Sequence, residues 1–479
     1  MATLKRENVI VIIIALLILL LSSLRSYFRA DDFAHLLSIR YETSEDIARL
    51  VTKPEFTGFF RPVVKLFFLV NYSISGLNAW TYIAGSVAIF VVDVYVYYWF
   101  VRAVSRDAFQ AEGAVLLLVL QMNTYLYAVN WIGAVSNVLA ALFVMTSVLF
   151  YIRSMSIGSF GWFAYAMSVI SFSLGLLSKE SCVVIPLILM AYDALFVLLD
   201  APGKARVAEL MILRYVPFGG VFVAYLVVRN ASGSLPFSGG YNYTLNLGAN
   251  IIRNGFFYGV QLGYLPGAVF VLALPSLLIK RLGFERKDSR VMLFGVFVAS
   301  VLSLPVLALS WSSPTWLFPP AIGTTLAASV LLRKCLAEGM GSRARFVLYG
   351  VLASALLGAG ILYMKLSEAR WLQWGSYTKN VLQELQRSYP ELPHGAEIYF
   401  VDRDVGKEYG IERLFRNHPG NAIRLWFDDL SLGAKTVGSW NELDAILGKN
   451  QNGIEDVYVF EYADGHVFDM TDALREGGR

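Results

Sequence analysis

The chain has 479 residues, of which 56% are hydrophobic and 16% are charged, and its mean hydropathy is +0.55. A soluble domain is about a quarter charged, so this composition excludes a single water-soluble globule, a disordered chain and a coiled coil. The 40 basic and 36 acidic residues leave a net charge of +4, which predicts no nucleic-acid partner. The sequence therefore predicts a protein that crosses a membrane several times.

Apolar stretches long enough to cross a bilayer, about 20 residues each, recur along the chain. The first, Val9 to Leu24, follows a short basic start and has no small-residue cleavage site after it, so we interpret it as a retained anchor. Residues 1–366 would form an all-α polytopic membrane domain of about eleven transmembrane helices. These are expected at residues 9–24, 79–101, 113–131, 134–152, 160–178, 181–199, 211–228, 255–279, 291–311, 317–333 and 346–366.

The basic residues indicate the orientation of this domain. Residues 280–290 carry five positive charges, whereas residues 310–315 carry none. Because Lys and Arg favour the cytoplasmic side, we expect a cytoplasmic N-terminus and, with an odd number of spans, an extracytoplasmic C-terminus. We expect a bacterial inner membrane because no retention signal is evident, although Asn230-Ala-Ser232 and Asn242-Tyr-Thr244 match the glycosylation acceptor pattern.

Beyond residue 367 the composition becomes that of a soluble domain. Residues 367–479 would form a small extracytoplasmic α/β domain whose acidic side chains are either an ordinary solvated surface or a cover that positions an acceptor. The expected strands are 396–401, 422–427, and a hairpin of 457–462 with 466–468, and the expected helices lie near 369–389, 407–416 and 440–448.

Asp31 and Asp32 follow the first span and lie in an acidic outer loop, residues 25–61. Adjacent carboxylates near a bilayer are unfavourable unless they are solvated, paired or functional. They are therefore either a hydrated helix cap or a general base for an acceptor hydroxyl. His35 has helix-face spacing from both, which would suit a divalent cation. With one His and no second cluster, however, we expect neither a metal nor another cofactor.

Arg61 and Lys65 lie four residues apart, on one face of an apolar stretch that is too short to span. We interpret this stretch as an interfacial or re-entrant helix. The two cations either snorkel to lipid headgroups or bind a ligand phosphate, which a guanidinium can hold through two parallel hydrogen bonds.

Lys179 and Glu180 lie between two spans, on the same predicted outer side as the two aspartates. Charges inside a long apolar stretch indicate a functional site, although an outer turn can also hold a solvated Lys-Glu pair. Arg229 and Arg253 flank a long outer loop, residues 230–254, and each alone would be a boundary anchor.

The charged motifs occur in a recognisable order along residues 25–230, with a fainter similarity at 316–323. The chain resembles the GT-C glycosyltransferases, and within them the protein O-mannosyltransferases with TPR repeats and their bacterial relatives. The residues that carry this resemblance are the double acid after the first span, Arg61-Pro62 at the start of an apolar helix, Gly76-Leu-Asn78, and Ser178-Lys-Glu180 followed by Pro186 and Tyr192-Asp193.

This resemblance implies an inverting transferase that uses a polyprenyl-phosphate-linked sugar at the outer leaflet. It assigns the catalytic base to Asp31 or Asp32 and the lipid-phosphate contacts to Arg61, Lys179 and Arg229. Supporting positions are Glu180, Lys65, Arg253 and His35. The expected partners are the lipid-linked sugar, membrane lipid, and a hydroxyl acceptor on a glycan, a lipid-linked glycan or a protein.

The chain also departs from its relatives. Where they usually carry Pro and histidines after Gly-Leu-Asn, it has Ala79, Ile83 and Phe90, and Ala134-Val-Ser-Asn137 replaces a Gly-Arg-x-Asp run. Pro314-Thr-Trp316 replaces a late Glu-Arg-Tyr, and no TPR repeats follow. The general reaction survives these changes, but the mannose donor and the acceptor class do not carry over.

Two other classes of protein fit parts of the sequence. A lipid-linked sugar flippase or transporter would use a charge within a span, such as Asp93, but transporters usually show repeat-related halves, which we do not find. A non-catalytic envelope assembly protein would use the exported tail to bind a partner.

Overall fold

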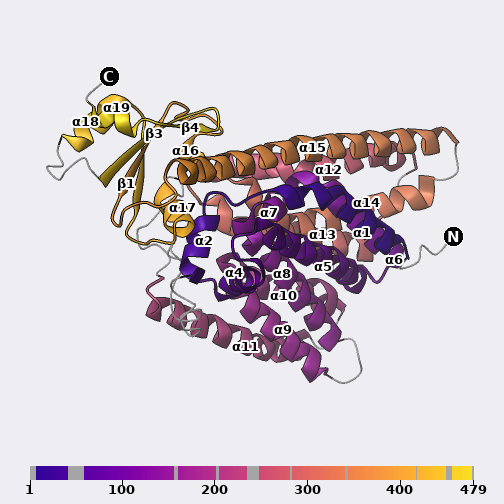
Figure 1. The fold of residues 1–479 in the computed structure, drawn as a ribbon. Helices are drawn as coiled ribbons and strands as arrows, with labels where there is room; N and C mark the ends of the chain where they lie inside the picture. Colours follow the sequence, from indigo (N-terminus) through magenta and orange to yellow (C-terminus); the bar gives the residue numbers. More distant parts are fainter. Residues whose placement is uncertain are drawn as a thin grey trace.

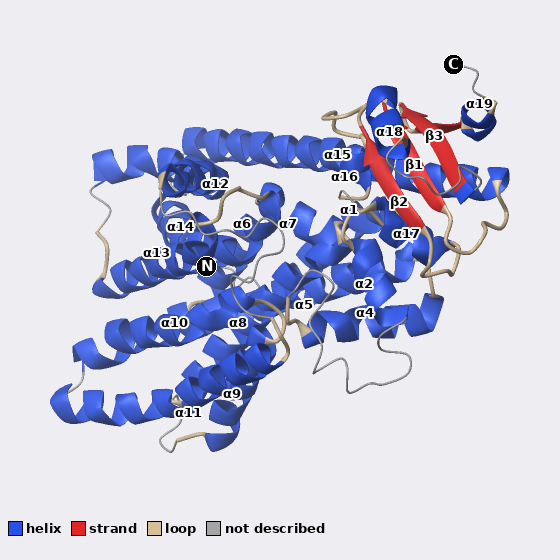
Figure 2. Cartoon of the chain, turned by 90° about the vertical axis from the view of Figure 1, so that its left-hand side faces the viewer, coloured by secondary structure: helices blue, strands red, loops and turns tan. Residues whose placement is uncertain are grey.

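The computed structural model describes residues 7–40, 59–155, 160–200, 204–234, 248–280, 283–339, 343–416, 418–448 and 456–476. Its helices pack into one body, and a four-stranded sheet lies at one end of that body (Figures 1 and 2). The acidic residues of the first outer loop beyond Arg40 and the second glycosylation pattern lie outside the described residues.

Every stretch predicted to span the membrane lies on a helix or on a run of consecutive helices. In chain order these are α1 (Glu7–Leu20) with η1 (Leu21–Arg25), α5 (Ala79–Ser105), α6 (Ala108–Leu120) with α7 (Met122–Asn130), η3 (Ile132–Ala134) with α8 (Val135–Ser154), α9 (Trp162–Leu176), η4 (Glu180–Val184) with α10 (Ile185–Tyr192), η5 (Asp193–Val197) and η6 (Leu198–Asp200), α11 (Lys204–Ala231), α12 (Ala249–Lys280), α13 (Arg286–Leu307), α14 (Phe318–Gly339) and α15 (Arg343–Ser388). Among the described residues, three shorter helices lie between them, namely α2 (Asp32–Ser38), α4 (Pro62–Ser75) and η7 (Pro314–Trp316).

The chain is an integral membrane protein. Among the described residues, five helices are long and apolar enough to cross a bilayer, and α6 and α7, which meet at a bend of 63°, make a sixth if they act as one span. The count of eleven crossings and the orientation of the two ends stay predictions.

Small residues allow α13 and α14 to touch through their backbones. A Cβ atom on Gly295 would lie 2.7 Å from the Gly323 carbonyl oxygen and 2.8 Å from the Ala327 amide nitrogen. Such close approach is typical of small residues at helix interfaces in membranes. The hydroxyl of Tyr97 on α5 donates to the Ile322 carbonyl at 3.0 Å, so α5, α13 and α14 form one packed unit.

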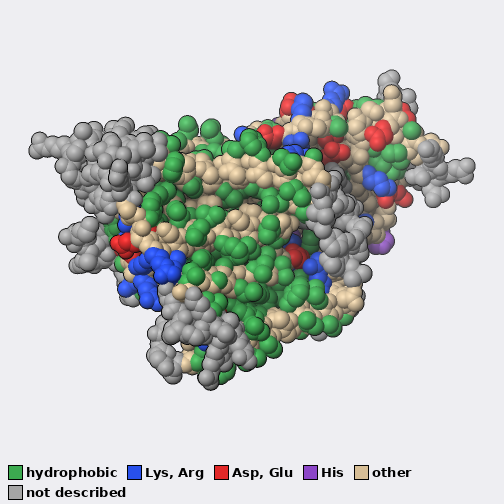
Figure 3. Space-filling view, turned by 180° about the vertical axis from the view of Figure 1, so that it is seen from behind, with side chains coloured by type: hydrophobic (Ala, Val, Ile, Leu, Met, Phe, Trp, Pro, Cys, Tyr) green, Lys and Arg blue, Asp and Glu red, His purple; other side chains and the backbone are tan. Residues whose placement is uncertain are grey.

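Charged side chains gather toward the ends of the helical body, whose flank is mostly apolar (Figure 3). At one end, Arg333 of α14 pairs with Asp107 at 3.3 Å and with Asp288, which also accepts from Lys334 at 2.9 Å. The predicted inner side includes both of these cations. Pairing three charged helix ends in this way avoids leaving an unpaired charge against the apolar core.

The sheet has the order β2-β1-β3-β4, formed by β1 (Glu397–Asp402), β2 (Gly433–Val437), β3 (Val457–Ala463) and β4 (His466–Asp469). Strand β1 pairs in parallel with β2 and β3, and β3 and β4 form the predicted antiparallel hairpin. Helix α15 runs along the helical body and reaches this sheet (Figure 1). It passes through residue 366, where the predicted domain boundary lies, and the division into two domains stays a prediction.

Alternation along β1 places its side chains in two cores. Ile398 and Phe400 pack into the large core that continues from the helical body, which also includes Ile423. Tyr399 and Val401 face the other side and pack with Leu443 of α18 (Trp440–Leu447). The sheet therefore continues directly from the core of the helical body.

Several elements near the sheet differ from the predictions. The predicted strand at 422–427 is wrong, because this segment belongs to α17 (Pro419–Trp426), which begins with a proline in its first turn. Periodicity alone does not separate a short apolar strand from a helix. The predicted helix at 407–416 is reduced to α16 (Ile411–Leu414), and β2 and α19 (Thr471–Arg475) were not predicted.

Candidate functional site

The turn that carries the two aspartates is held by the C-terminal region of the chain. Ala30 has a φ of 50°, in the left-handed region that alanine rarely adopts. Its amide donates to the carbonyl of Leu414 at 2.7 Å, and the ring centroids of Phe33 and Phe415 lie 5.7 Å apart. Residues next to α16 therefore stabilise the backbone from which Asp31 and Asp32 project.

Asp32 is bonded to backbone on both oxygens. It is 1% exposed, and its Oδ2 and Oδ1 accept from the amides of Arg29 at 3.0 Å and Gly133 at 2.7 Å. A Cβ atom at Gly133 would lie 3.0 Å from Oδ1, so the glycine permits this approach. Burial raises the pKa of Asp32 to about 7. Asp32 therefore connects α2 to the turn before α8.

Asp31 is the more accessible of the two carboxylates, with a side chain that is 21% exposed. Its Oδ2 accepts from the guanidinium of Arg416, which the C-terminal region supplies. Burial raises the pKa of Asp31, whereas Arg416, His418 and Arg61 act in the opposite direction. This carboxylate is thus open to a ligand on one side and held by a cation on the other.

Arg29 lies in a cage of tryptophans beside the acidic motif. Its guanidinium carbon lies 3.4 Å from the ring centroid of Trp371, 4.4 Å from that of Trp374 and 5.2 Å from that of Trp131. Such rings attract a cation through their quadrupole. Burial lowers the pKa of Arg29 to about 9. Because two of these rings belong to α15, this helix is tied to the acidic motif.

His35 and Lys65 are two buried residues close to the acidic motif. His35 stacks on Phe68 with ring centroids 4.6 Å apart, and Lys65 is 2% exposed. Burial, and then the positive charges of Arg61, Lys65 and Arg416, lower the pKa of His35 to about 3. This imidazole is therefore neutral at physiological pH. Within the part of the chain that the structure describes, no three His, Cys, Asp or Glu side chains form a group that could hold a metal.

Arg61 and Glu180 form an ion pair between α4 and η4. Atoms Nη2 and Nε of Arg61 donate to the same carboxylate oxygen, Oε2, at 2.9 and 3.3 Å. Arg229 is close enough to Glu180 to act on it electrostatically, and its Nη1 donates to the Tyr225 hydroxyl at 3.2 Å. The predicted residues Arg61, Glu180 and Arg229 thus come together from three parts of the chain.

Lys179 lies beside this pair in the turn between α9 and η4. It is 7% exposed and donates to the side-chain oxygen of Asn137. Burial, and then the charge of Arg61, lower the pKa of Lys179 to about 7. Arg253 does not belong to this group in the described contacts, because its guanidinium donates instead to the carbonyl of Ser310 at 2.5 Å. We refer to Arg61, Lys179 and Arg229 as the cationic cluster.

The cationic cluster and the acidic motif adjoin one another. The charge of Arg61 acts on both Asp31 and His35, while the same side chain pairs with Glu180. An accessible carboxylate next to buried cations can take up a proton on one side, and the cations can stabilise an anion on the other.

No protein-family model and no curated protein matches the chain by sequence. Solved structures match it in three dimensions. ArnT from Cupriavidus metallidurans bound to undecaprenyl phosphate has a TM-score of 0.56 at 13% identity, covering 98% of this chain and 94% of that chain. ArnT from the same organism in the apo state has a TM-score of 0.55 at 11% identity, covering 98% of this chain and 94% of that chain. The apo oligosaccharyltransferase of Archaeoglobus fulgidus has a TM-score of 0.50 at 11% identity, covering 90% of this chain and 65% of that chain.

The chain has the GT-C fold. This confirms the fold that the ordered motifs predicted, and the alignment extends over the C-terminal region as well as the membrane helices. At these identities the likeness concerns the GT-C fold alone and assigns no role to an individual residue.

Sequence reasoning missed three residues of this candidate site. Arg416 is 385 positions from Asp31, and no sequence signal connects them. Arg29 precedes the acidic pair, but its tryptophan partners come from α15 and from the turn before α8. Asn137 falls where relatives carry an acidic residue, which is a signal that pointed to this position without identifying Lys179 as its partner.

Proposed function

We propose that this protein is an inverting glycosyltransferase that moves a sugar from a polyprenyl-phosphate donor to a hydroxyl acceptor on the extracytoplasmic side. The acceptor would be a glycan, a lipid-linked glycan or a protein. The observation that carries this proposal is the accessible carboxylate of Asp31 beside Arg61 of the cationic cluster, within a GT-C fold. The undecaprenyl phosphate bound to ArnT supports a lipid phosphate as the donor group.

In the proposed reaction Asp31 acts as the general base. Its carboxylate takes the proton of the acceptor hydroxyl, whose oxygen forms a bond to the anomeric carbon of the sugar. The bond from that carbon to the phosphate oxygen breaks, and its electron pair leaves with the polyprenyl phosphate. Attack from the face opposite the leaving group inverts the anomeric centre in one displacement. Burial raises the pKa of Asp31, which makes the carboxylate a stronger base.

The cationic cluster would hold the phosphate and stabilise the charge that develops on it. Lys179 is buried with a pKa of about 7, and an arriving phosphate would favour its charged form. Glu180 would keep Arg61 in place through the two hydrogen bonds to Oε2. We propose no cofactor, since a polyprenyl phosphate is already an adequate leaving group.

The two aspartates would have different roles. Asp32 accepts two backbone hydrogen bonds and is nearly inaccessible, so we assign it to positioning the turn. Asp31 would be the catalytic base, and Arg416 would be a positioning residue that orients the carboxylate and keeps it ionised. The buried residues around this arrangement, His35, Lys65 and Arg29, would hold it in place.

The test is a transfer assay with the full chain in liposomes and a purified polyprenyl-phosphate sugar. We expect Asp31→Asn to slow transfer by about 10²–10⁴-fold, the usual contribution of a general base. The matched control is Asp428→Asn, which removes an exposed carboxylate paired with Arg40 near the same surface and is expected to keep the wild-type rate. Full transfer by Asp31→Asn would refute the mechanism.

The same assay separates the enzyme from a transporter. An enzyme releases polyprenyl phosphate, whereas a flippase moves unchanged lipid-linked sugar across the vesicle. Asp93, the residue that a transporter would use, is fully buried in α5, and neither of its oxygens has a hydrogen-bond partner among the described residues. No observation among the described residues favours transport, so we do not propose it.

A further inference from the structure

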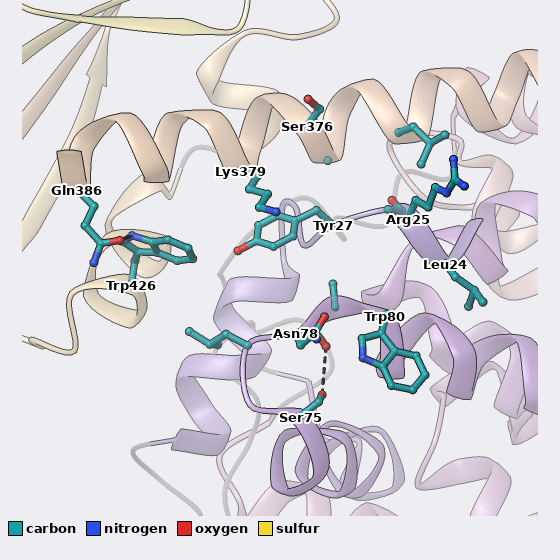
Figure 4. Close-up of a pocket in the computed structure, with 15 residues that line it drawn as sticks. Leu24, Arg25, Tyr27, Ser75, Asn78, Trp80, Ser376, Lys379, Gln386 and Trp426 are labelled. Atoms are coloured by element: carbon teal, nitrogen blue, oxygen red, sulfur yellow. Dashed lines mark hydrogen bonds between the residues drawn. The ribbon is translucent and has the colours of Figure 1, made fainter. Parts of the chain in front are cut away.

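A cavity of about 850 Å³ lies apart from the cationic cluster and the two aspartates (Figure 4). Its walls are the end of η1 with the residues after it, the α4–α5 turn, and one side of α15, and Trp426 closes one end. Pockets of about 300–1,000 Å³ are typical of ligand sites. None of the residues that we assign to sugar transfer lines it.

The cavity depends on a close contact between α15 and the segment after the first span. A Cβ atom on Gly375 would lie 2.7 Å from the Tyr27 backbone nitrogen, so only glycine allows the two backbones to approach so closely. This contact brings Lys379, one helical turn beyond Gly375, to the same side as Tyr27, with its Nζ 5.9 Å from the Tyr27 ring centroid.

The charge of the lining is one-sided. Among the described residues, Arg25 from η1 and Lys379 from α15 line the cavity and no carboxylate does. Ser26 also belongs to the lining; this residue is 6% exposed, and its buried Oγ has no partner among the described residues. Such an unpaired buried donor is unfavourable unless a ligand or water satisfies it. Two cations and a free hydroxyl donor are complementary to an anion.

A row of exposed apolar side chains lies along the first helix, which ends at this cationic site. Ile10, Ile14, Leu17 and Leu21 are 53%, 51%, 38% and 58% exposed, and their spacing of four, three and four residues places them on one helix face. Arg25 lies at the end of η1, four residues beyond Leu21. Beside it Trp80, at the start of α5, is 51% exposed, as is typical of aromatic residues at a membrane surface.

We propose that this cavity binds the phosphate headgroup of an anionic membrane lipid, with an acyl chain along the face of α1 that Ile10, Ile14, Leu17 and Leu21 form. Arg25, Lys379 and Ser26 contact the phosphate, and Trp80 packs against the upper part of the chain. The lipid joins η1 to α15 and so holds the C-terminal half of α15 against the membrane helices. This site does not depend on the proposed sugar transfer.

Native mass spectrometry of the delipidated full chain tests this site. The ligands are phosphatidylglycerol, undecaprenyl phosphate and, as the zwitterionic comparison, phosphatidylcholine. Arg25→Gln and Lys379→Gln are each expected to weaken binding of an anionic lipid by roughly three- to tenfold, and the double variant by more. Lys365→Gln is the matched control, because Lys365 is an exposed lysine on α15 outside the cavity. This variant should bind anionic lipid like the wild type. Arg25→Lys should restore most of the affinity lost in Arg25→Gln.

The anionic lipid that binds in an Arg25- and Lys379-dependent way identifies the source of the headgroup, either the bulk bilayer or the carrier lipid. Equal binding of phosphatidylglycerol and phosphatidylcholine would overturn the proposal. Anionic-lipid binding that is unchanged in the double variant would also overturn it. So would displacement of the lipid by inorganic phosphate at the lipid's own concentration, because the acyl chain would then contribute nothing to binding. Because the readout is a bound mass, failure of sugar transfer does not affect the result.

Discussion

Replacing Arg416 with glutamine tests whether the C-terminal region takes part in the proposed chemistry. Arg416 holds the pKa of Asp31 below the value that burial alone would produce. Without this cation the pKa of Asp31 rises, so a smaller fraction of the carboxylate is ionised at a given pH. The acid limb of the pH–rate profile should therefore move to higher pH in Arg416→Gln. The profile of Arg416→Lys, which keeps the charge, should lie between those of the wild type and Arg416→Gln.

The magnitude follows from the exposure of the pair. Two unit charges about 4 Å apart interact with about 4 kcal/mol at an effective dielectric constant of about 20. The side chains of Arg416 and Asp31 are 33% and 21% exposed, so solvent screening reduces this to about 1.4 kcal/mol, above the range for fully exposed pairs. That energy corresponds to about a tenfold loss of kcat on the acid side.

The assay is initial-rate transfer from a purified polyprenyl-phosphate sugar, measured across the pH range at saturating donor. Arg413→Gln is the control, since it removes a cation from the neighbouring α16 that forms no ion pair with Asp31 among the described contacts. A wild-type pH profile for Arg416→Gln, or a faster rate at every pH, would refute a positioning role for Arg416.

Three further predictions follow from burial around the site. Trp371→Ala removes a ring that is 3% exposed and packs on Arg29, and should lower stability by about 3–5 kcal/mol, seen as a lower thermal-unfolding midpoint, whereas Trp162→Ala, at a 74% exposed position, should not. Because the pKa of Asp32 is raised to about 7, its stability contribution is complete below its ordinary pKa and is lost as pH rises through about 7. The wild-type midpoint should therefore fall as pH rises from about 4 to about 7, and a slope unchanged in Asp32→Asn would contradict this. Arg61→Gln should raise the donor KM about tenfold, with a smaller change in kcat. It should also lower the thermal-unfolding midpoint, since the largely buried carboxylate of Glu180 loses its partner. An unchanged KM in the transfer assay would show that Arg61 does not bind the phosphate.

Local patterns predicted much of the secondary structure. The stretch at 396–401 forms β1, and the two segments around Asp464 and Gly465 form the hairpin of β3 and β4, because alternation and turn residues are short-range signals. The segment at 422–427 was predicted wrongly, because the faces that it buries are set by α2 and β2, which lie elsewhere in the chain. Where a segment packs decides between helix and strand when its own pattern is ambiguous.

Within the site, sequence reasoning identified the charged residues but not their arrangement. Asp31 and Asp32 are chemically identical neighbours, and the sequence offers no basis for choosing between them. The structure separates them, because Asp32 is covered and bonded to two backbone amides, whereas Asp31 remains accessible and meets Arg416. Arg253, grouped with the cationic residues by its predicted side, is turned toward Ser310 instead.

The sequence by itself determined that this is a membrane protein with its few charges concentrated in short segments between apolar stretches, and the order of those segments led to the GT-C fold. Hydropathy and charge sidedness act residue by residue, so they can be summed along a chain without knowledge of contacts. Only the tertiary structure decided that Arg416 meets Asp31 and that Arg25 shares a cavity with Lys379. Burial and pairing depend on which distant segments exclude water from one another, and that information is absent from any local stretch of sequence.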